Sequence, residues 1–384
     1  MTDNLFQPFT FANGISLRNR LVMAPMTTWA ANADGSISDA ELDYYRARAG
    51  GVGLVLTGCT HVQPSGIGFI DEFAAYDDSF IPSLKRLAQA ARSGGSVAVL
   101  QLFHAGNKAV PELVPDGELV SASAVVAPKG PFNEGKLASR ALNQQEIETL
   151  IHDFGAATRR AIEAGFDGVE LHGAHGFLIQ NFLSPLSNQR TDKWGGTLEN
   201  RMRFPLAVIR EVRRVIGRYA RRPFLLGYRL SPEEAGDGGL RIEDTLALAQ
   251  RLVEEGHIDY LHTSLYDILA GKSLDDESGK TTAQRFIELL AGRVPLMAAG
   301  NIRTPDEARQ ARALGLPLVV IGKGLVMNPT WVELAQSGRE HEIHPVLDLS
   351  VGAARYQMPE KLWRVIEDTP GWFPTLKGIS PTQA

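Results

Sequence analysis

Residues 169–203, VELHGAHGFLIQNFLSPLSNQRTDKWGGTLENRMR, carry the most informative pattern in the chain. With the preceding glycine they start as an apolar run, Gly168–Leu171, which is typical of a buried strand. His172 and His175 follow this run directly. A strand that ends in this way places two imidazole rings at its carboxyl end, which is the end of an α/β barrel where active sites lie.

The histidine pair has three interpretations. A zinc site would need a third ligand, and no HExxH motif or Cys/His cluster accompanies the pair, so we predict no metal. Backbone groups could instead satisfy both rings. We favour the third interpretation, in which His172 and His175 are neutral and donate hydrogen bonds to an anionic oxygen.

The composition narrows the class of protein. The chain has 384 residues, of which 44% are hydrophobic and 22% charged, as is normal for one α/β barrel with insertions. A net charge of −5 argues against a nucleic-acid partner, and no apolar run is long enough to span a membrane. One cysteine, Cys59, excludes an intrachain disulfide framework and a cysteine-ligated iron–sulfur cluster. Without a signal-peptide pattern at the N-terminus, we expect a cytoplasmic protein.

Short apolar runs alternate with amphipathic, helix-like runs along the chain. This alternation predicts a parallel sheet, and eight strands favour closure into a (β/α)8 TIM barrel. We expect the strands at Leu21–Pro25, Gly53–Gly58, Ser96–Phe103, Gly168–Leu171, Pro223–Leu230, Tyr260–Leu265, Val294–Gly300 and Leu318–Gly322. The helices are expected near Asp39–Ala49, Ile81–Ser93, Glu146–Ala164, Glu199–Ile216, Ile242–Glu255, Thr282–Ala291, Asp306–Leu314 and Leu325–Gln336.

We expect a single domain, 1–384, with three additions to the plain barrel. Residues 1–20 form a hairpin cap that plugs the barrel bottom, with a type I′ turn at Asn13-Gly14. Residues 104–142 are too long for an ordinary barrel loop and are predicted to cover the substrate. Residues 337–384 form a C-terminal extension with a helix near Pro359–Glu367, which either packs on the barrel wall or reaches the site.

Several strand ends carry residues suited to a flat ring. Strand one ends in an apolar turn and a hydroxyl, and strand two in a glycine that allows close approach of a ligand. Strand three ends in Gln101, whose amide offers a donor and an acceptor. Strand five carries Arg229, a buried cation that needs an anion, either a ligand or Glu170. The first two strand ends contribute Ala24, Pro25, Met26, Thr27, Trp29 and Gly58. Cys59 is interpreted as a small buried residue.

The ends of strands seven and eight have the pattern of a phosphate site. Gly300 and Gly322 allow backbone N–H groups to approach a phosphate, beside Asn301 and the cation Lys323. Barrels commonly bind phosphate at these two loops. A phosphorylated ring cofactor fits the whole set. Flavin mononucleotide (FMN) fits better than pyridoxal phosphate, because no lysine is obviously placed for a Schiff base.

The segment HGAHGFLIQNFLSPLSNQRTDKWGGTLENRMRF closely resembles the long signature of the Old Yellow Enzyme family of FMN-dependent ene-reductases. The motifs RLVMAPM, QLFHAG and YRLS, and a glycine–lysine pair where the family usually has glycine–arginine, follow in the family's order. The chain is most similar to the bacterial NADH:flavin oxidoreductase branch.

The resemblance implies roles for individual residues. Gln101, Arg229 and Gly322-Lys323 match flavin-binding positions, and Thr27 matches the position that contacts flavin O4. Trp29 matches a substrate-pocket position. His172 and His175 match the pair that holds the carbonyl or nitro oxygen of the substrate. The implied reaction has two steps: NADH or NADPH reduces FMN, and FMN then transfers hydride to the β-carbon of an activated alkene.

One position departs from the family pattern. Phe177 stands where the family usually has the tyrosine that protonates the α-carbon of the alkene. Water or another hydroxyl, such as that of Tyr266, would then have to supply the proton. The implied partners are small-molecule substrates, and the sequence is compatible with a homodimer.

Two alternatives are open. A reductase of quinones or nitro compounds, or a flavin demethylase-like relative, would use the same flavin site, and quinone reduction needs no proton donor at position 177. A non-redox barrel, such as an aldolase or isomerase, would use the phosphate site for its substrate.

Overall fold

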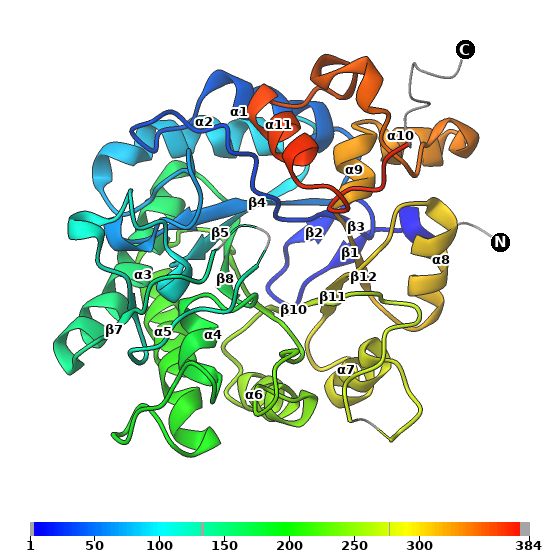
Figure 1. The fold of residues 1–384 in the computed structure, drawn as a ribbon. Helices are drawn as coiled ribbons and strands as arrows, with labels where there is room; N and C mark the ends of the chain where they lie inside the picture. Colours follow the sequence, from blue (N-terminus) through cyan, green and yellow to red (C-terminus); the bar gives the residue numbers. More distant parts are fainter. Residues whose placement is uncertain (1–3, 131, 133, 276, 377–384) are drawn as a thin grey trace, which may run out of the picture.

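The barrel strands are short, nearly fully buried, and parallel throughout. In the computed structural model, which describes residues 4–130, 132, 134–275 and 277–376, they close into an eight-stranded barrel because the last strand pairs with the first (Figure 1). In barrel order the strands are β3 (Leu21–Met23), β4 (Leu54–His61), β5 (Val97–Phe103), β8 (Gly168–Gly173), β9 (Leu225–Leu230), β10 (Tyr260–Ser264), β11 (Leu296–Ala299) and β12 (Leu318–Ile321). The predicted TIM barrel is confirmed.

Helices surround the strands and cover their outward-facing side chains (Figure 1). They are α1 (Asp39–Ala49), α2 (Ile81–Arg92), α3 (Gln144–Ala164), α4 (Leu178–Leu183), α5 (Leu198–Tyr219), α6 (Ile242–Glu254), α7 (Thr282–Leu290), α8 (Pro305–Ala313), α9 (Lys323–Met327), α10 (Trp331–Gln336) and α11 (Glu360–Asp368). None of the helices in the described ranges is long and apolar enough to cross a membrane.

Two helices differ from the prediction. The expected helix Leu325–Gln336 is divided into α9 and α10, because Pro329 between them has no N–H and disfavours helical backbone at the residue before it. Helix α4 was not predicted. All of its residues are buried, so its sequence lacks the polar face that gives an amphipathic helix its periodicity.

The N-terminal hairpin is present, but its turn is not type I′. Strands β1 (Phe9–Thr10) and β2 (Ser16–Leu17) pair antiparallel. A type I′ turn needs positive φ at both central residues, and only Gly14 (φ 92) of the pair Asn13-Gly14 has it. The Asn13 side chain instead accepts a hydrogen bond from Ile15 N–H. Phe11 of this hairpin joins the cluster inside the barrel, so the predicted plug forms.

The C-terminal extension is tied to the barrel by Arg48 of α1. Its buried guanidinium donates hydrogen bonds to the carbonyl oxygens of Tyr44, Leu325, Val326, Tyr356 and Gln357. Burial lowers the pKa of Arg48 to about 10, so the side chain is still a cation at neutral pH. The predicted additions 1–20, 104–142 and 337–384 include positions 1–3, 131, 133 and 377–384, which lie outside the described residues.

Replacing Arg48 with methionine should lower the free energy of unfolding by about 3 kcal/mol, because several buried carbonyl oxygens lose their donor. Chemical denaturation measures this change, and limited proteolysis should cut faster within residues 337–376. Arg46→Met on the same helix is the control, since Arg46 is exposed and forms an ion pair with Asp43 one turn away. Equal stability of the Arg48→Met variant and the wild type would contradict the claim that Arg48 stabilises the packing of the extension on the barrel.

Candidate active site

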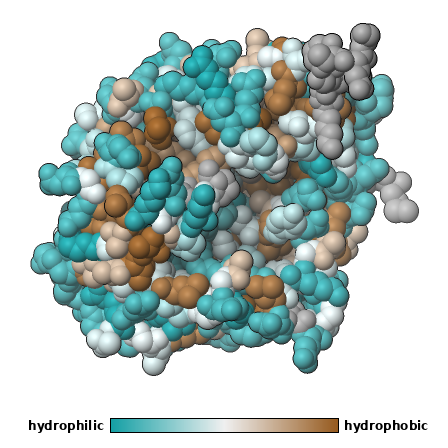
Figure 2. Space-filling model, in the orientation of Figure 1, coloured by the Kyte–Doolittle hydropathy of each residue, from teal (hydrophilic) through white to brown (hydrophobic). Residues whose placement is uncertain are grey.

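A cavity of about 340 Å³ lies at the carboxyl ends of strands β3, β4, β5, β8 and β9. Figure 2 shows that the face drawn there is hollowed near its centre. The barrel contributes Pro25, Met26, Thr27, Cys59, Gln101, His172, His175, Phe177 and Arg229 to the lining, and the loops contribute Gly68, Phe69, Lys108, Gly130 and Phe132. Most of the residues predicted for the site are therefore brought together around one cavity.

A buried carboxylate, Glu170, organises the floor of this cavity. Gln101 Nε2 donates to Glu170 Oε1 at 2.7 Å, and His262 Nδ1 lies 3.0 Å from Glu170 Oε2. Burial alone would raise the pKa of Glu170, but His262, Arg229 and Gln101 outweigh it and lower the pKa below the ordinary value. Glu170 is thus ionised, and both of its oxygens are engaged.

Two buried polar atoms of the cavity-lining residues have no protein partner within the described ranges. They are Oε1 of Gln101, an acceptor, and Nε of Arg229, a donor. Arg229 donates through Nη2 to Ser264 Oγ at 3.1 Å and forms no ion pair with a described carboxylate. A buried unpaired group costs about 1–3 kcal/mol, so this pair fits a bound group with a complementary donor and acceptor, such as the edge of a flavin pyrimidine.

The two histidine rings meet at the end of β8, with centroids 5.0 Å apart. Nδ1 of His172 accepts from Ala174 N–H at 3.2 Å, which leaves Nε2–H for the cavity. Nε2 of His175 lies 2.8 Å from Ser264 Oγ, and the backbone N–H of His175 donates to Ser231 Oγ. These contacts orient both rings, and each keeps one nitrogen free for a ligand.

The pKa of both imidazoles is lowered well below 6.5, which favours the neutral form of each ring. His172 is buried, and burial is the main cause of its shift. His175 is exposed at the barrel mouth, where desolvation and then the nearby cations Arg229 and Lys108 lower its pKa. Neutral rings donate hydrogen bonds without giving up a proton, as a site for a developing negative charge requires. The predicted donor pair has the geometry and the charge state for this role.

Some predicted cofactor residues lie beside the cavity at the ends of β11 and β12. Gly300 and Asn301 follow β11, and Gly322 and Lys323 follow β12. Lys323 is half-buried, and burial together with the neighbouring Arg303 lowers its pKa. Two neighbouring cations next to glycine-rich backbone are the groups that bind a phosphate. The geometry is therefore compatible with a phosphate site at the ends of β11 and β12, which stays a prediction.

Four further residues named from the sequence lie outside the lining of this cavity, and the site roles predicted for Gly58, Trp29 and Ala24 stay predictions. Gly58 is needed because a Cβ there would lie 2.8 Å from Met26 O, and its N–H donates to the Tyr45 hydroxyl, so the close approach is to protein rather than ligand. Trp29 does not line the cavity but packs behind it, against Phe69 and Phe132. Tyr266, the suggested proton donor, is 97% exposed and lies outside the lining. Ala24 is buried, and it too lies outside the lining.

Several residues at the site were not predicted. Phe69 and Phe132 form an apolar wall, Ser264 and Ser231 orient His175, and Lys108 places a cation on the cavity surface. Lys108 follows the QLFHAG motif by two positions, so its place directly after strand three could have indicated from the sequence that it lies near the site. The remaining contacts join distant segments and leave no local pattern.

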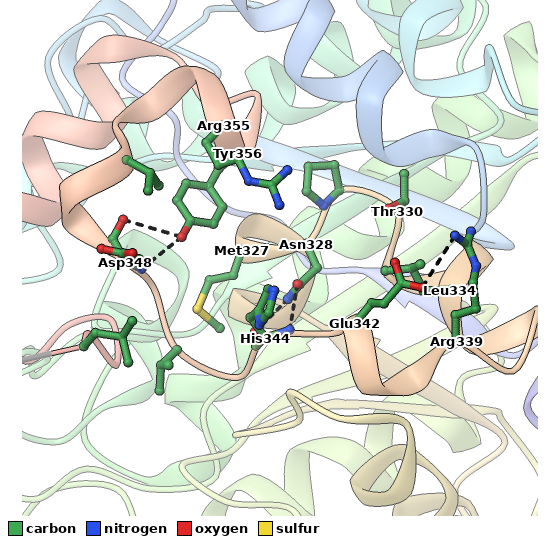
Figure 3. Close-up of a pocket in the computed structure, with 14 residues that line it drawn as sticks. Met327, Asn328, Thr330, Leu334, Arg339, Glu342, His344, Asp348, Arg355 and Tyr356 are labelled. Atoms are coloured by element: carbon green, nitrogen blue, oxygen red, sulfur yellow. Dashed lines mark hydrogen bonds and ion pairs between the residues drawn. The ribbon is translucent and has the colours of Figure 1, made fainter.

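A larger cavity, of about 540 Å³, lies between α9, α10 and the extension (Figure 3). It is lined by polar residues such as Asn328, His344 and Tyr356, and Figure 3 shows the hydrogen bonds of Asn328 with His344 and of Tyr356 with Asp348. The residues predicted for the site do not line it, so the smaller cavity is the candidate active site.

Comparison with known proteins agrees with this site. The model of the NADH:flavin oxidoreductase / NADH oxidase family matches residues 4–342. A probable NADH-dependent flavin oxidoreductase, YqiG of Bacillus subtilis (strain 168), is 44% identical over 96% of this chain and 97% of that protein. An NADH:fumarate oxidoreductase of Klebsiella pneumoniae (strain 342) is 38% identical over 95% of this chain, which covers 39% of that longer protein. The structure of an old yellow enzyme homologue from Zymomonas mobilis aligns with a TM-score of 0.75 at 26% identity, over 87% of this chain and 93% of that one.

The chain belongs to the NADH:flavin oxidoreductase / NADH oxidase family. The resemblance to Old Yellow Enzyme is confirmed, and the protein is an NAD(P)H-dependent oxidoreductase with FMN as its cofactor. The alternative of a non-redox aldolase or isomerase is set aside.

Cys59 should react slowly with iodoacetamide although it lines the cavity. Burial, followed by the nearby Glu72, raises the pKa of the Cys59 thiol to about 12. At mildly alkaline pH the thiolate fraction, and with it the alkylation rate, should be about a thousandfold below that of a free thiol. Intact-mass spectrometry across pH measures the rate, with protein unfolded in denaturant as the control. Rapid alkylation of the folded protein at neutral pH would show the assigned environment to be wrong.

Proposed function

We propose that this enzyme uses NADH or NADPH to reduce activated alkenes, either α,β-unsaturated carbonyl compounds or nitroalkenes. The observation that carries the proposal is that two histidines in ring contact, His172 and His175, line one partly apolar cavity and have pKa values shifted toward the neutral form. FMN, when bound, accepts hydride from the nicotinamide and donates hydride to the alkene.

Residues on two sides of the mouth would hold the cofactor. Gln101 and Arg229 offer the unpaired acceptor and donor for the ring edge, and the Thr27 hydroxyl lies on the same wall. Pro25 and Met26 give the ring an apolar surface. Lys323, with Gly300, Asn301 and Gly322 nearby, would meet the phosphate, and its partial burial strengthens its attraction to an anion.

The imidazoles would act on the alkene's electron-withdrawing group. As the double bond is reduced, negative charge builds on the carbonyl or nitro oxygen, and both N–H groups can donate to that oxygen. Donors that are fixed in place before the charge develops contribute several kcal/mol, because they need no reorganisation. The contacts from Ala174 and Ser264 hold the rings in that orientation.

Quinones are the second candidate class of acceptor. Phe177 supports this alternative because its side chain carries no acidic proton, and reduction of a quinone needs no proton on carbon. The fumarate named for the Klebsiella relative is not adopted as a substrate, because the chain covers 39% of that protein.

His172→Ala and His175→Ala should each lower the rate of cyclohexenone reduction by about 100-fold, which is the usual cost of one oxyanion donor. Bound flavin, measured from the visible absorbance, should be unchanged, since the cofactor contacts lie elsewhere. His341→Ala is the matched control, because His341 is exposed on the extension. Wild-type cyclohexenone turnover in a fully flavin-loaded His172→Ala variant would refute the assignment, and a wild type that reduces quinones alone would favour the second class of acceptor.

A further inference from the structure

Reduction of an alkene needs a proton as well as a hydride, and the source of this proton is not evident from the histidine pair. Hydride on the β-carbon leaves an enolate or nitronate whose α-carbon must be protonated. Phe177 has no proton to give, and the Tyr266 hydroxyl is far out in solvent. The inference below rests on the proposed alkene reduction.

Lys108 places an ammonium group on the cavity surface beside Phe177. It ends the short 3-10 helix Gly106–Lys108 that follows β5. Its Nζ lies 5.8 Å from the Phe177 ring centroid and donates to His175 O at 2.7 Å. A Cβ at Gly176 would lie 2.8 Å from this Nζ, so the glycine leaves the space that the ammonium occupies. The His175 carbonyl oxygen and the absence of a side chain at Gly176 therefore fix where the Lys108 ammonium lies.

The other titratable side chains among the described residues that line the cavity are less suitable acids than Lys108. His172 and His175 are neutral, and the pKa of the Cys59 thiol is raised to about 12. Arg229 does not release a proton in proteins. Burial lowers the pKa of Lys108 below its ordinary value, and Glu234 opposes this shift only in part. Lys108 forms no ion pair with a carboxylate of the described residues, so nothing fixes its proton in a salt bridge.

A path for returning the proton exists on the other side of Lys108. A second cavity, of about 590 Å³, shares Lys108 and His175 with the first. Its walls include the carboxylate residue Glu234 and the exposed side chains of Val126 and Leu186, so water can enter it. Lys108 thus stands between the substrate cavity and a second, water-accessible cavity that Glu234 also lines.

We propose that Lys108 is the general acid that protonates the α-carbon of the alkene, in place of the missing tyrosine. The hydride that originates from NAD(P)H forms the new β-carbon–hydrogen bond, and the π electrons move toward the oxygen held by the histidines. These electrons then take a proton from Lys108 Nζ, which forms the α-carbon–hydrogen bond and leaves a neutral amine. Water in the second cavity returns a proton to the amine, so atoms and charge balance over one turnover.

Three variants test this assignment by the rate at which reduced enzyme is reoxidised by cyclohexenone. Lys108→Met should be slower by about 100-fold, a typical loss for one general acid. Lys108→Arg should be nearly as slow, because the guanidinium keeps the charge but holds its protons too tightly. Reoxidation by a quinone should fall much less than reoxidation by cyclohexenone in both variants, because a quinone needs no proton on carbon. Lys85→Met, which removes an exposed lysine of α2, is the matched control.

A second substitution distinguishes proton donation from a structural role. Phe177→Tyr in the Lys108→Met background should restore much of the cyclohexenone rate, because a phenol then faces the same part of the cavity. The wild-type rate should fall as pH rises through the pKa of Lys108, since only the protonated amine can donate, and Lys108→Met should lack this fall. An Arg variant with the wild-type rate, or a Met variant that slows quinones equally, would overturn the proposal.

The protonation of Lys108 can also be measured without turnover. Competitive acetylation followed by peptide mass spectrometry should show Lys108 becoming reactive at lower pH than Lys85. Reactivity that begins at the same or a higher pH contradicts the acid assigned here. If the wild type reduces cyclohexenone and Lys108→Met matches it, the role of Lys108 alone fails. If the wild type does not reduce cyclohexenone, the proposed function fails as well.

Discussion

The buried charge of Glu170 constrains the rest of the site. A carboxylate inside a barrel is costly unless hydrogen bonds and opposite charge compensate it. Here Gln101 and His262, from the neighbouring strand β5 and from β10, supply the two hydrogen bonds, and Arg229 adds positive charge nearby. Because the Gln101 amide nitrogen is used for Glu170, its oxygen is left for the cavity. Because both Glu170 oxygens are engaged, Arg229 keeps a donor for a ligand.

The histidines and Lys108, which lie above Glu170, differ in charge and can therefore have different chemical roles. Arg229 and Ser264 link the floor to His175, so the same cation that serves the cofactor also helps keep the imidazole neutral. Neutral rings stabilise charge on oxygen without exchanging protons. The cation Lys108 lies beside them and forms no ion pair with a carboxylate of the described residues. Stabilisation of the oxygen and supply of a proton can therefore be assigned to different residues.

The outer wall of the site comes from segments that are far apart in the chain. Trp29 follows β3, Phe132 belongs to the long excursion, and Trp372 belongs to the C-terminal extension, and their rings contact one another. Arg48 holds the extension against the barrel, and Trp372 of the extension packs on Phe132, which lines the cavity. The extension thus packs on the barrel wall and contacts one residue of the cavity lining.

The sequence by itself determined the barrel, its strand ends and the histidine pair. Apolar alternation and helix caps are local patterns, and closure of eight parallel strands brings their carboxyl ends together whatever the details of packing. Only the tertiary structure showed which buried polar atoms have no protein partner, that Gly58 allows the backbone of Met26 to approach closely, and that Lys108 lies next to Phe177. These features depend on contacts such as that between Glu170 and His262, which are 92 positions apart. No short pattern encodes such a contact, because the energy of a buried charge or donor is fixed by the neighbours that the fold brings to it.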